Sequence, residues 1–273
     1  MLMAAARLEM PAIFLNGGPM YPASYCGRHY DGNIVTEAIG WKQQGRIDEE
    51  EFRHIEDIAE PCPGSCAMLG TANTMSALSE SLGMSLMGSS TIPAVLAARM
   101  AKGVETGEKI VELVQKGVTT RDILTEEAFE NAVMHLLTMG GSTNGILHLQ
   151  AIYHEAGLGE LPLSVFDEFS RKIPQVASIY PASEFDMVDF YEGGGVPAVL
   201  KEIEEYLHKD TLTVSGLTMG EALSRFSYTN NRNMIKTAEE PFAPTGGVAI
   251  LKGNIAPLGC VIKPAAVPKH MFR

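Results

Sequence analysis

Apolar residues recur every three or four positions along most of the chain, and this period predicts a helix-rich fold. Ala72, Met75, Leu78 and Leu82 mark one such helix, and end signals mark others: Asp48 and Thr125 are good N-caps, and Gly157 is a natural C-terminal stop. The predicted helices cover residues 1–10, 33–43, 48–60, 71–82, 93–116, 125–139, 145–156 and 197–208.

Short β-branched and apolar runs predict strands between and after these helices. Pro11–Asn16 precedes the turn Gly17-Gly-Pro19, and Thr211–Val214 follows a helix, which together suggest the helix–strand rhythm of an α/β fold. From about residue 228 the helical pattern gives way to short apolar runs, and 248–252 and 260–263 are predicted strands separated by turn residues. We therefore expect a helix-rich α/β domain over 1–227 and the beginning of a β-rich, barrel-like domain over 228–273.

Composition narrows the class of protein. The 273 residues are 45% hydrophobic and 20% charged, with a formal net charge of −12, as in globular proteins. An acidic chain without a basic block argues against a nucleic-acid partner. No apolar run is long enough to span a membrane, and the start lacks the features of a secretory signal, so a cytoplasmic protein is expected. The first helix begins without a cap, and we expect Met1 to be an internal methionine of a longer protein.

The four cysteines are too few for a disulfide scaffold, and two of them share the loop Cys62-Pro-Gly-Ser-Cys66. Thiolates bind soft metals, and a Pro/Gly loop can direct sulfur toward one point. Cys66 is followed by a predicted helix, whose N-terminal dipole is expected to lower the thiol pKa. The alternative is a pair of small buried residues in a tight loop. No second Cys or His pair of metal-ligand spacing completes the site.

The turn Gly140-Gly-Ser-Thr-Asn144 lies between two predicted helices. Free N–H groups at the start of the second helix would suit a carboxylate or phosphate, so Gly141, Ser142, Thr143 and Asn144 are candidate substrate-binding residues. The alternative is a capped turn in which Ser142 or Thr143 accepts from the helix. His135, on an apolar helix, is interpreted as a core residue.

Several segments together resemble the dihydroxy-acid dehydratase and phosphogluconate dehydratase family, in the family's order and over nearly the whole chain. They are Leu2–Leu8 with Ile13–Met20; Gly64-Ser-Cys-Ala-Met-Leu-Gly-Thr-Ala-Asn-Thr-Met75 with Glu80-Ser-Leu-Gly-Met84; Gly140-Gly-Ser-Thr-Asn144 with Leu147-His-Leu149; Gly193-Gly-Gly-Val-Pro197; and Gly247-Val-Ala-Ile-Leu-Lys-Gly-Asn-Ile-Ala-Pro257. The cysteine–Thr-Ala-Asn block and the Gly-Asn-x-Ala-Pro block are the most specific.

The resemblance implies an iron–sulfur hydro-lyase that removes water from a 2,3-dihydroxy carboxylic acid to give a 2-keto acid. One iron of a 2Fe-2S or 4Fe-4S cluster would act on the departing 3-hydroxyl, and Mg²⁺ would hold the carboxylate and 2-hydroxyl. Cys66 matches the last of the family's three cluster cysteines and is the candidate metal ligand. The expected partner is a small-molecule substrate, and the longer parent is expected to be a homodimer.

This chain departs from the family pattern at both ends. The family's Cys-Asp-Lys-x-x-Pro-Gly motif would come just before Met1, and its later metal-binding glutamate and catalytic serine would follow Arg273. No catalytic residue is therefore assigned within the chain, and the chain alone is expected to be inactive. Dihydroxy-acid dehydratase, of branched-chain amino-acid biosynthesis, is the favoured activity. The alternatives are a sugar-acid dehydratase, suggested by the glycine before Thr71, and a non-catalytic remnant.

Overall fold

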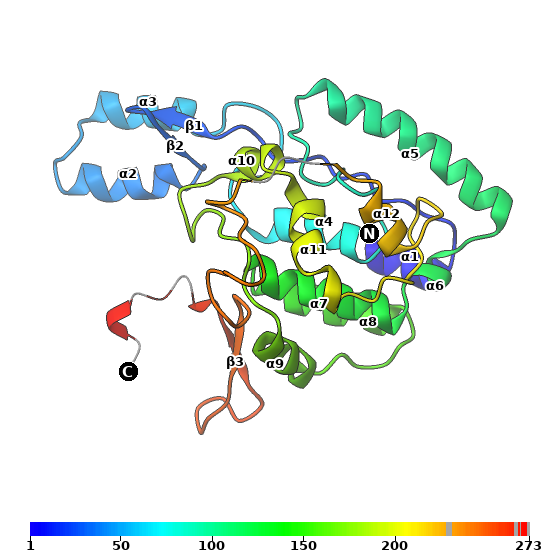
Figure 1. The fold of residues 1–273 in the computed structure, drawn as a ribbon. Helices are drawn as coiled ribbons and strands as arrows, with labels where there is room; N and C mark the ends of the chain where they lie inside the picture. The colour runs from blue at the N-terminus through cyan, green and yellow to red at the C-terminus, as the bar shows by residue number, and fades with distance from the viewer. Residues whose placement is uncertain (228–230, 265–266, 268, 272–273) are drawn as a thin grey trace.

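Helices dominate the computed structural model, which describes residues 1–227, 231–264, 267 and 269–271. Figure 1 shows them grouped around a central set, with one small lobe projecting to one side. The α-helices are α1 (Leu2–Leu8), α2 (Ile34–Gln43), α3 (Glu49–Ile58), α4 (Thr71–Ser81), α5 (Ala97–Lys116), α6 (Thr120–Ile123), α7 (Glu126–Met139), α8 (Asn144–Glu155), α9 (Leu163–Lys172), α10 (Met187–Glu192), α11 (Gly195–Glu202) and α12 (Met219–Ser224), with 3₁₀ turns η1 (Glu204–Tyr206) and η3 (Lys269–Met271).

The strands in the described part of the chain form two small antiparallel hairpins. β1 (Ala23–Tyr25) pairs with β2 (Arg28–Tyr30), and β3 (Ala249–Leu251) pairs with β4 (Cys260–Ile262), with Ala249 opposite Ile262. A helix-rich body followed by a hairpin near the C-terminus agrees with the expected α/β class. The expected boundary at 227/228 adjoins residues 228–230, which lie outside the described residues, and so remains a prediction.

The core is built around α7, which is apolar on nearly every side and buried along almost its whole length. α4 and α8 pack against it from one side and α9 and α11 from others, an arrangement visible in Figure 1. His135 of α7 is fully buried, and its Nδ1 lies 3.1 Å from the Ser81 hydroxyl, which confirms its interpretation as a core residue. Burial lowers its pKa to about 3, so the ring is neutral.

The β1–β2 hairpin, α2 and α3 form the projecting lobe, which has a core of its own (Figure 1). Ile34 and Ala38 of α2 face Ile55 of α3. The predicted cap is present, since the Asp48 carboxylate accepts the N–H of Glu51 at 2.8 Å. The His29 ring lies 3.1 Å from the carboxylate of Asp186, the N-cap of α10, and so connects the lobe to the body.

The C-terminal hairpin packs directly onto the helical body. Val248 belongs to the main hydrophobic cluster, and its carbonyl accepts from the Ser170 hydroxyl of α9 at 2.6 Å. The N–H of Gly247 donates to the Leu137 carbonyl, and a Cβ at Gly247 would lie 2.6 Å from the Gly140 Cα. A glycine is therefore needed where the hairpin crosses the end of α7.

Most predicted helices are confirmed to within a few residues, and the caps at Thr125 and Gly157 are also in place. Within the described residues no helix combines the length and apolar character needed to cross a membrane.

Two predicted strands are wrong. Pro11–Asn16 is extended, but of its backbone only Phe14 bonds to another segment, through the N–H to Met84 and the carbonyl to the Ser85 hydroxyl. Thr211–Val214 forms only an isolated bridge between Leu212 and Thr218. Both segments have the composition of strands, but a strand needs a ladder of successive backbone pairs. Thr211–Val214 bonds to the nearby 217–219 backbone and to Gly83, but this contact is a tight turn with a single bridge and does not extend into a ladder.

Candidate functional site

The Cys66 loop lies against two other loops at a point of close backbone approach. Ser65 forms a parallel bridge with Pro19, in which the Met20 N–H donates to the Ser65 carbonyl at 2.8 Å and the Ser65 N–H donates to the Gly18 carbonyl at 2.9 Å. On the other side of this segment, the Ala94 N–H donates to the Pro19 carbonyl at 2.9 Å. Residues 17–20, 64–66 and 92–94 therefore form one stack.

Two glycines make this stack possible. Gly64 has a φ of 145°, and a Cβ there would lie 2.4 Å from the Met20 nitrogen. Gly18 has a φ of 89°, and a Cβ there would lie 2.1 Å from the Ile92 carbonyl oxygen. Both positions combine a left-handed backbone with contacts too short for any side chain, so only glycine fits.

Asn73, in the first turn of α4, anchors the cysteine loop from inside. Its side chain is buried, and its Nδ2 donates to the carbonyls of Cys66 at 2.5 Å and Met68 at 2.7 Å. Its Oδ1 accepts from the Ser65 hydroxyl at 2.6 Å. One amide thus fixes the backbone on both sides of Cys66 and leaves the cysteine itself exposed.

The same turn of α4 also binds the second candidate segment. The Thr74 hydroxyl accepts the Ser142 N–H at 3.0 Å, and the Thr71 hydroxyl accepts from Asn144 Nδ2 at 2.8 Å. The hydroxyls of Thr71 and Ser142 lie 3.3 Å apart. The cysteine loop and the 140–144 turn are thereby both bonded to one helix end, although about 75 residues separate them in the sequence.

The 140–144 turn leads into α8 without a side-chain cap at its N-cap residue, Thr143, and carries polar side chains at its surface. The Ser142 hydroxyl accepts the Asn144 N–H at 3.3 Å, and the N–H groups of Gly145 and Ile146 donate to the carbonyls of Ser142 and Thr143. The donors expected to bind an anion are thus already bonded. What the turn offers a ligand is the side chains of Ser142, Thr143 and Asn144, while Gly141 is buried against Thr74 and Leu136.

The predicted lowering of the Cys66 pKa is wrong in direction. Partial burial of the thiol raises its pKa, and the carboxylates of Asp31 and Glu60 raise it further. The helix dipole has little effect because α4 begins at Thr71, five residues after the cysteine, and the dipole acts only near the first turn. Cys66 is therefore a thiol that needs a bound cation to ionise near neutral pH.

The other cysteines do not join Cys66. Cys62 lies in the same loop, and its sulfur accepts the Tyr21 N–H at 3.3 Å. Cys26 lies in the β1–β2 turn and Cys260 on β4, both exposed. Within the described ranges no three His, Cys, Asp or Glu side chains gather as a metal site would require. The residues present fit one ligand of an iron–sulfur cluster and do not by themselves hold it.

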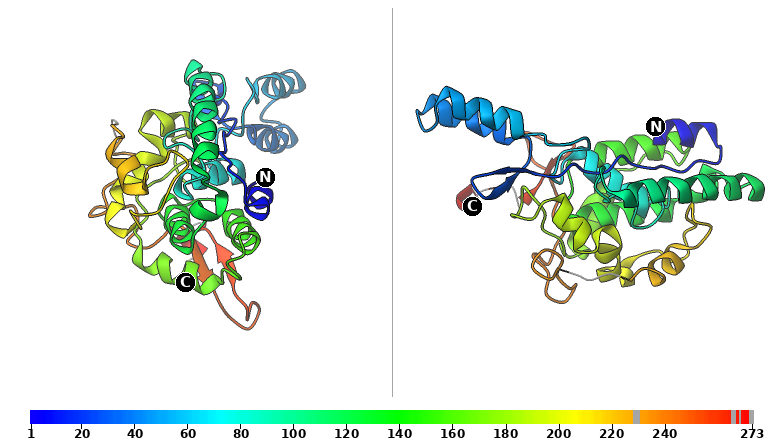
Figure 2. Two further views of the ribbon diagram at one scale, coloured as in Figure 1. Left: turned by 90° about the vertical axis from the view of Figure 1, so that its right-hand side faces the viewer. Right: turned by 90° about the horizontal axis from the view of Figure 1, so that it is seen from above.

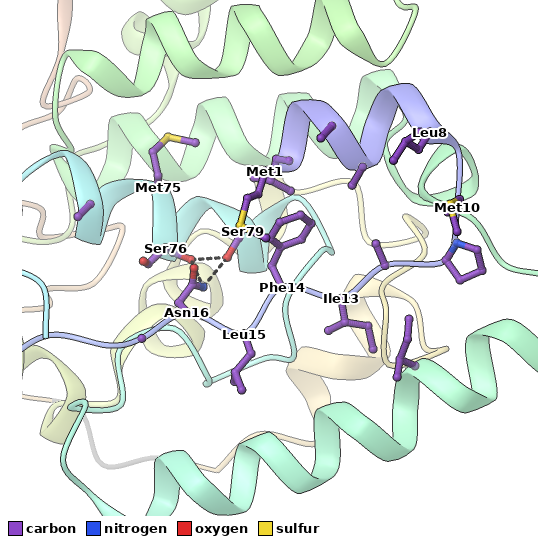
Figure 3. A pocket seen from close by; sticks show the side chains of 18 residues that line it. Met1, Leu8, Met10, Ile13, Phe14, Leu15, Asn16, Met75, Ser76 and Ser79 are labelled. Carbon is purple, nitrogen blue, oxygen red and sulfur yellow. Dashed lines mark hydrogen bonds between the residues drawn. The ribbon is translucent and has the colours of Figure 1, made fainter.

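A groove of about 930 Å³ lies between α1, α4, α5 and the extended segment 11–17 and adjoins the candidate site at Gly17 and Ala72 (Figure 3). Its lining is mainly apolar. Asn16 points toward α4, where its Nδ2 donates to the Ser79 hydroxyl at 3.0 Å. The groove offers apolar surface and no cluster of acid–base groups, so it is not the candidate chemical site.

A buried polar cluster supports the loop stack from behind. The Glu80 carboxylate accepts the N–H groups of Gly88 and Ser90, each at 2.6 Å, and burial raises its pKa to about 7. Arg99, in the first turn of α5, donates to the Ile92 carbonyl, while its Nε and Nη1 are buried without a protein partner. The Ile92 carbonyl also lies against Gly18, so this cluster fixes the position of the 92–94 segment relative to the 17–20 segment.

Comparison with known protein families gives matches over nearly the whole chain. The model of the dihydroxy-acid/6-phosphogluconate dehydratase N-terminal domain matches residues 1–222, and that of the C-terminal domain matches residues 233–273. This chain belongs to the dihydroxy-acid/6-phosphogluconate dehydratase family. Within it, the chain is 47% identical over 275 residues to the dihydroxy-acid dehydratase of Caldanaerobacter subterraneus subsp. tengcongensis and 47% identical over 274 residues to that of Halothermothrix orenii.

A third dehydratase of the family, from Pyrococcus furiosus, is 46% identical over 269 residues. These alignments cover 100%, 100% and 98% of this chain but 49%, 49% and 48% of the relatives. The chain therefore spans about half the length of the curated relatives it matches.

Sequence reasoning about this dehydratase-family chain missed the residues that join its two candidate segments. Thr71, Asn73 and Thr74 appeared only as part of a motif, and Glu80 only as part of another. Their signal is that polar side chains are interspersed with the apolar positions of α4. Several of them point inward, where each needs a hydrogen-bond partner.

Proposed function

We propose that this chain forms the cluster-bearing half of an iron–sulfur hydro-lyase that converts a 2,3-dihydroxy carboxylic acid to a 2-keto acid, as a dihydroxy-acid dehydratase. The observation that carries the proposal is the double attachment at α4. Its first turn bonds the Cys66 loop through Asn73 and the 140–144 turn through Thr71 and Thr74. A thiol ligand and a set of hydroxyl and amide groups thereby share one rigid support.

Each part of this support has a role in the proposed enzyme. Cys66 supplies one thiolate to the cluster. Because its pKa is raised, the thiol keeps its proton until the cluster binds and releases it then. Ser142, Thr143 and Asn144 present donors and acceptors to the substrate's carboxylate and hydroxyls. The remaining cluster ligands, the Mg²⁺ ligands and the base come from residues outside this chain, so we assign no catalytic step to its side chains.

The proposal extends to the organisation of the protein. Residues 1–227 form the domain that carries Cys66, and residues 228–273 begin a β-rich domain. We propose a cytoplasmic enzyme with a small-molecule substrate, no nucleic-acid partner, and a homodimeric complete form.

A chimera tests this function. This chain replaces the matching half of the Caldanaerobacter subterraneus dehydratase, to which it is 47% identical. After anaerobic iron and sulfide loading, we expect the chimera to release 2-keto acid from a branched-chain 2,3-dihydroxy acid. Cys66→Ser abolishes both iron retention and turnover, whereas Cys26→Ser and Cys260→Ser retain both.

Three results contradict the proposal. A Cys66→Ser chimera with normal iron and sulfide content rules out the ligand role. A chimera that binds iron but turns over only aldonic or phosphogluconic acids replaces the favoured substrate with the sugar-acid alternative. A properly folded chimera that neither binds iron nor turns over either substrate supports the non-catalytic remnant.

A further inference from the structure

Two neighbouring segments join the projecting lobe to the body. They are residues 20–22, before β1, and residues 61–65, after α3, and we call them the paired arms. The Met20 N–H donates to the Ser65 carbonyl at 2.8 Å, so the arms are bonded to each other at their base. Cys66 follows that base directly. The whole lobe therefore leaves the body at one point, beside the candidate cluster ligand.

The lobe packs on itself rather than on the body. Its core consists of Ile34, Ala38, Ile55 and Ala59, and the partly buried apolar side chains around them also come from the lobe. β1, β2, α2 and α3 make their main contacts with one another. Figures 1 and 2 show the lobe, in blue, standing off from the helical body. A unit with its own core on a narrow connection can rotate as one body about that connection.

Two polar side-chain contacts hold the lobe against the body in the described part of the chain. The His29 ring lies 3.1 Å from the Asp186 carboxylate, and Asn33 Nδ2 donates to the Met68 sulfur at 3.3 Å. A thioether sulfur is a weak acceptor, whereas a carboxylate is a strong one. The contact of His29 with Asp186 is therefore the main side-chain attachment of the lobe.

Asp186 connects this attachment to the candidate site. One of its oxygens caps the start of α10, and the other faces His29. The next residue, Met187, donates its N–H to the Ala67 carbonyl at 2.9 Å. The lobe is therefore attached to a helix start that is itself bonded to the residue after Cys66.

The lobe also forms one wall of the site. Burial raises the pKa of Cys66 most, and the carboxylates of Asp31 and then Glu60, at the two ends of the lobe, raise it further. Burial and then the lobe's carboxylates, Asp31 among them, raise the pKa of Tyr180 in the body. One oxygen of Asp31 accepts the Asn33 N–H at 2.9 Å, and the other is buried without a partner. Such an oxygen costs free energy, and movement of the lobe away from the body would hydrate it.

We propose that His29 is a positioning residue of the candidate site. Its contact with Asp186 holds the projecting lobe as a hinged wall beside Cys66, and release of this contact lets the lobe rotate about the paired arms and opens access to the cysteine. The inference names what controls entry to the site of the proposed function. It uses the position of Cys66 and not its role as a ligand, and its tests use neither cluster nor turnover, so the two proposals can fail separately.

Alkylation of Cys66 tests the wall. Iodoacetamide labelling of the reduced 273-residue chain is followed by mass spectrometry, with Cys260 as the internal reference. We expect His29→Ala to raise the Cys66 rate by about threefold or more, in line with the modest strength of a partly exposed pair. His54→Ala, which removes an exposed histidine from α3 of the same lobe, should leave the rate unchanged. His29→Lys, whose ammonium group can also reach the Asp186 carboxylate, should restore most of the protection.

The pH dependence of the labelling separates access from ionisation. The rate reached at high pH, where all of the thiol is ionised, reports access alone. We expect His29→Ala to raise this limiting rate. If the variant shifts only the apparent pKa of Cys66 and leaves the limiting rate unchanged, the lobe does not restrict access and the proposal is overturned.

A distance measurement tests the movement. Spin labels are placed at Glu56→Cys on α3 and Glu168→Cys on α9, both exposed, with the four native cysteines changed to Ser. We expect pulsed electron paramagnetic resonance to give a distance distribution that His29→Ala broadens or shifts and that His29→Lys restores. His29 is 60% exposed, so its replacement should leave the helical circular dichroism signal unchanged. The proposal requires both the faster limiting alkylation and the changed distances, and the absence of either one overturns it.

Discussion

The two ends of α4 have different surroundings and serve different purposes. At the N-terminal end, Thr71 and Asn73 direct their polar atoms to two loops that reach the surface. At the C-terminal end, Ser79, Glu80 and Ser81 are completely or almost completely buried and bond to the segments beneath those loops. In the proposed enzyme, the N-terminal end of α4 positions the groups for chemistry and the C-terminal end holds the surrounding segments in place. Function and stability should therefore separate along this one helix, and the predictions below test that separation.

The largest expected effect concerns whether this chain alone can catalyse the reaction. We expect the 273-residue chain, purified alone and loaded with iron and sulfide, to show no turnover of a 2,3-dihydroxy acid. On the proposed assignment, its described residues supply one cluster ligand, Cys66, and they include no metal-binding group of three side chains. The measurement is 2-keto acid formation against an empty-vector control. Turnover above that control would show that the site is complete within this chain.

Removal of the buried carboxylate tests the supporting end. Glu80→Ala leaves the N–H groups of Gly88 and Ser90 without their acceptor and removes the larger of the two charge interactions, with Glu80 and Tyr191, that raise the pKa of Arg99. We expect a loss of about 4 kcal/mol in the free energy of unfolding, measured by urea denaturation. Glu105→Ala, which breaks a surface pair on α5, should cost about 0.5 kcal/mol or less. Similar losses for the two variants would contradict the supporting role.

The pH dependence of stability gives a second test of Glu80. Its pKa is about 7 in the folded chain, against 4.5 for an ordinary glutamate, so the folded state binds more protons between these values. This group's contribution to stability is therefore complete below pH 4.5 and is lost as pH rises toward 7, by about 3 kcal/mol. Glu80→Gln should lack this component, seen as the difference between two urea titrations from pH 4.5 to 8. Parallel pH profiles would mean that Glu80 titrates normally.

At the presenting end, Asn73→Ala should cost about 2 kcal/mol, because the carbonyls of Cys66 and Met68 lose their donor. The more specific readout is the cysteine itself, since a loosened loop removes the remaining burial of the already exposed Cys66 thiol and increases its alkylation rate. Mass spectrometry of iodoacetamide-treated protein measures that rate, and Cys260 on β4 serves as the internal reference. An unchanged ratio of Cys66 to Cys260 labelling would show that Asn73 does not fix the loop.

The smallest expected effect is at the partly exposed hydroxyl of Thr71. Thr71→Val keeps the shape of the side chain but removes the acceptor for Asn144 Nδ2, and we expect a loss of about 1 kcal/mol. In the chimera, the same change should raise KM more than it lowers kcat, because it frees the 140–144 turn rather than the cysteine loop. A loss confined to kcat would contradict that division.

The sequence predicts elements well where local signals decide them. The apolar period gives α4, and the side chains of Asp48 and Thr125 mark the starts of α3 and α7. It fails at Pro11–Asn16, because an apolar run cannot show whether a second backbone lies alongside. It also fails for the Cys66 pKa, whose direction depends on Asp31 and Glu60 and on a helix that begins five residues later.

The candidate site was predicted in its parts and missed as a whole. Cys66 and the 140–144 turn both stand out as Gly-rich interruptions of helical sequence. Their union through Thr71 and Thr74 depends on how α4 packs against α7 and α8, which is set by tertiary contacts far apart in the sequence. No local sequence pattern shows which segments will lie side by side in the fold.

The loop stack has a consequence for how such an enzyme can diversify. Gly18 and Gly64 leave no room for even one methyl group, so the position of Cys66 is fixed by steric exclusion rather than by a choice among side chains. Thr143 and Asn144, by contrast, are partly and fully exposed, and although Asn144 Nδ2 donates to Thr71, steric exclusion does not fix these side chains in the same way. If the 142–144 turn binds the substrate as proposed, variation in the accepted acid can accumulate there while the cysteine stays in place, and new specificities can arise without rebuilding the segments that support it.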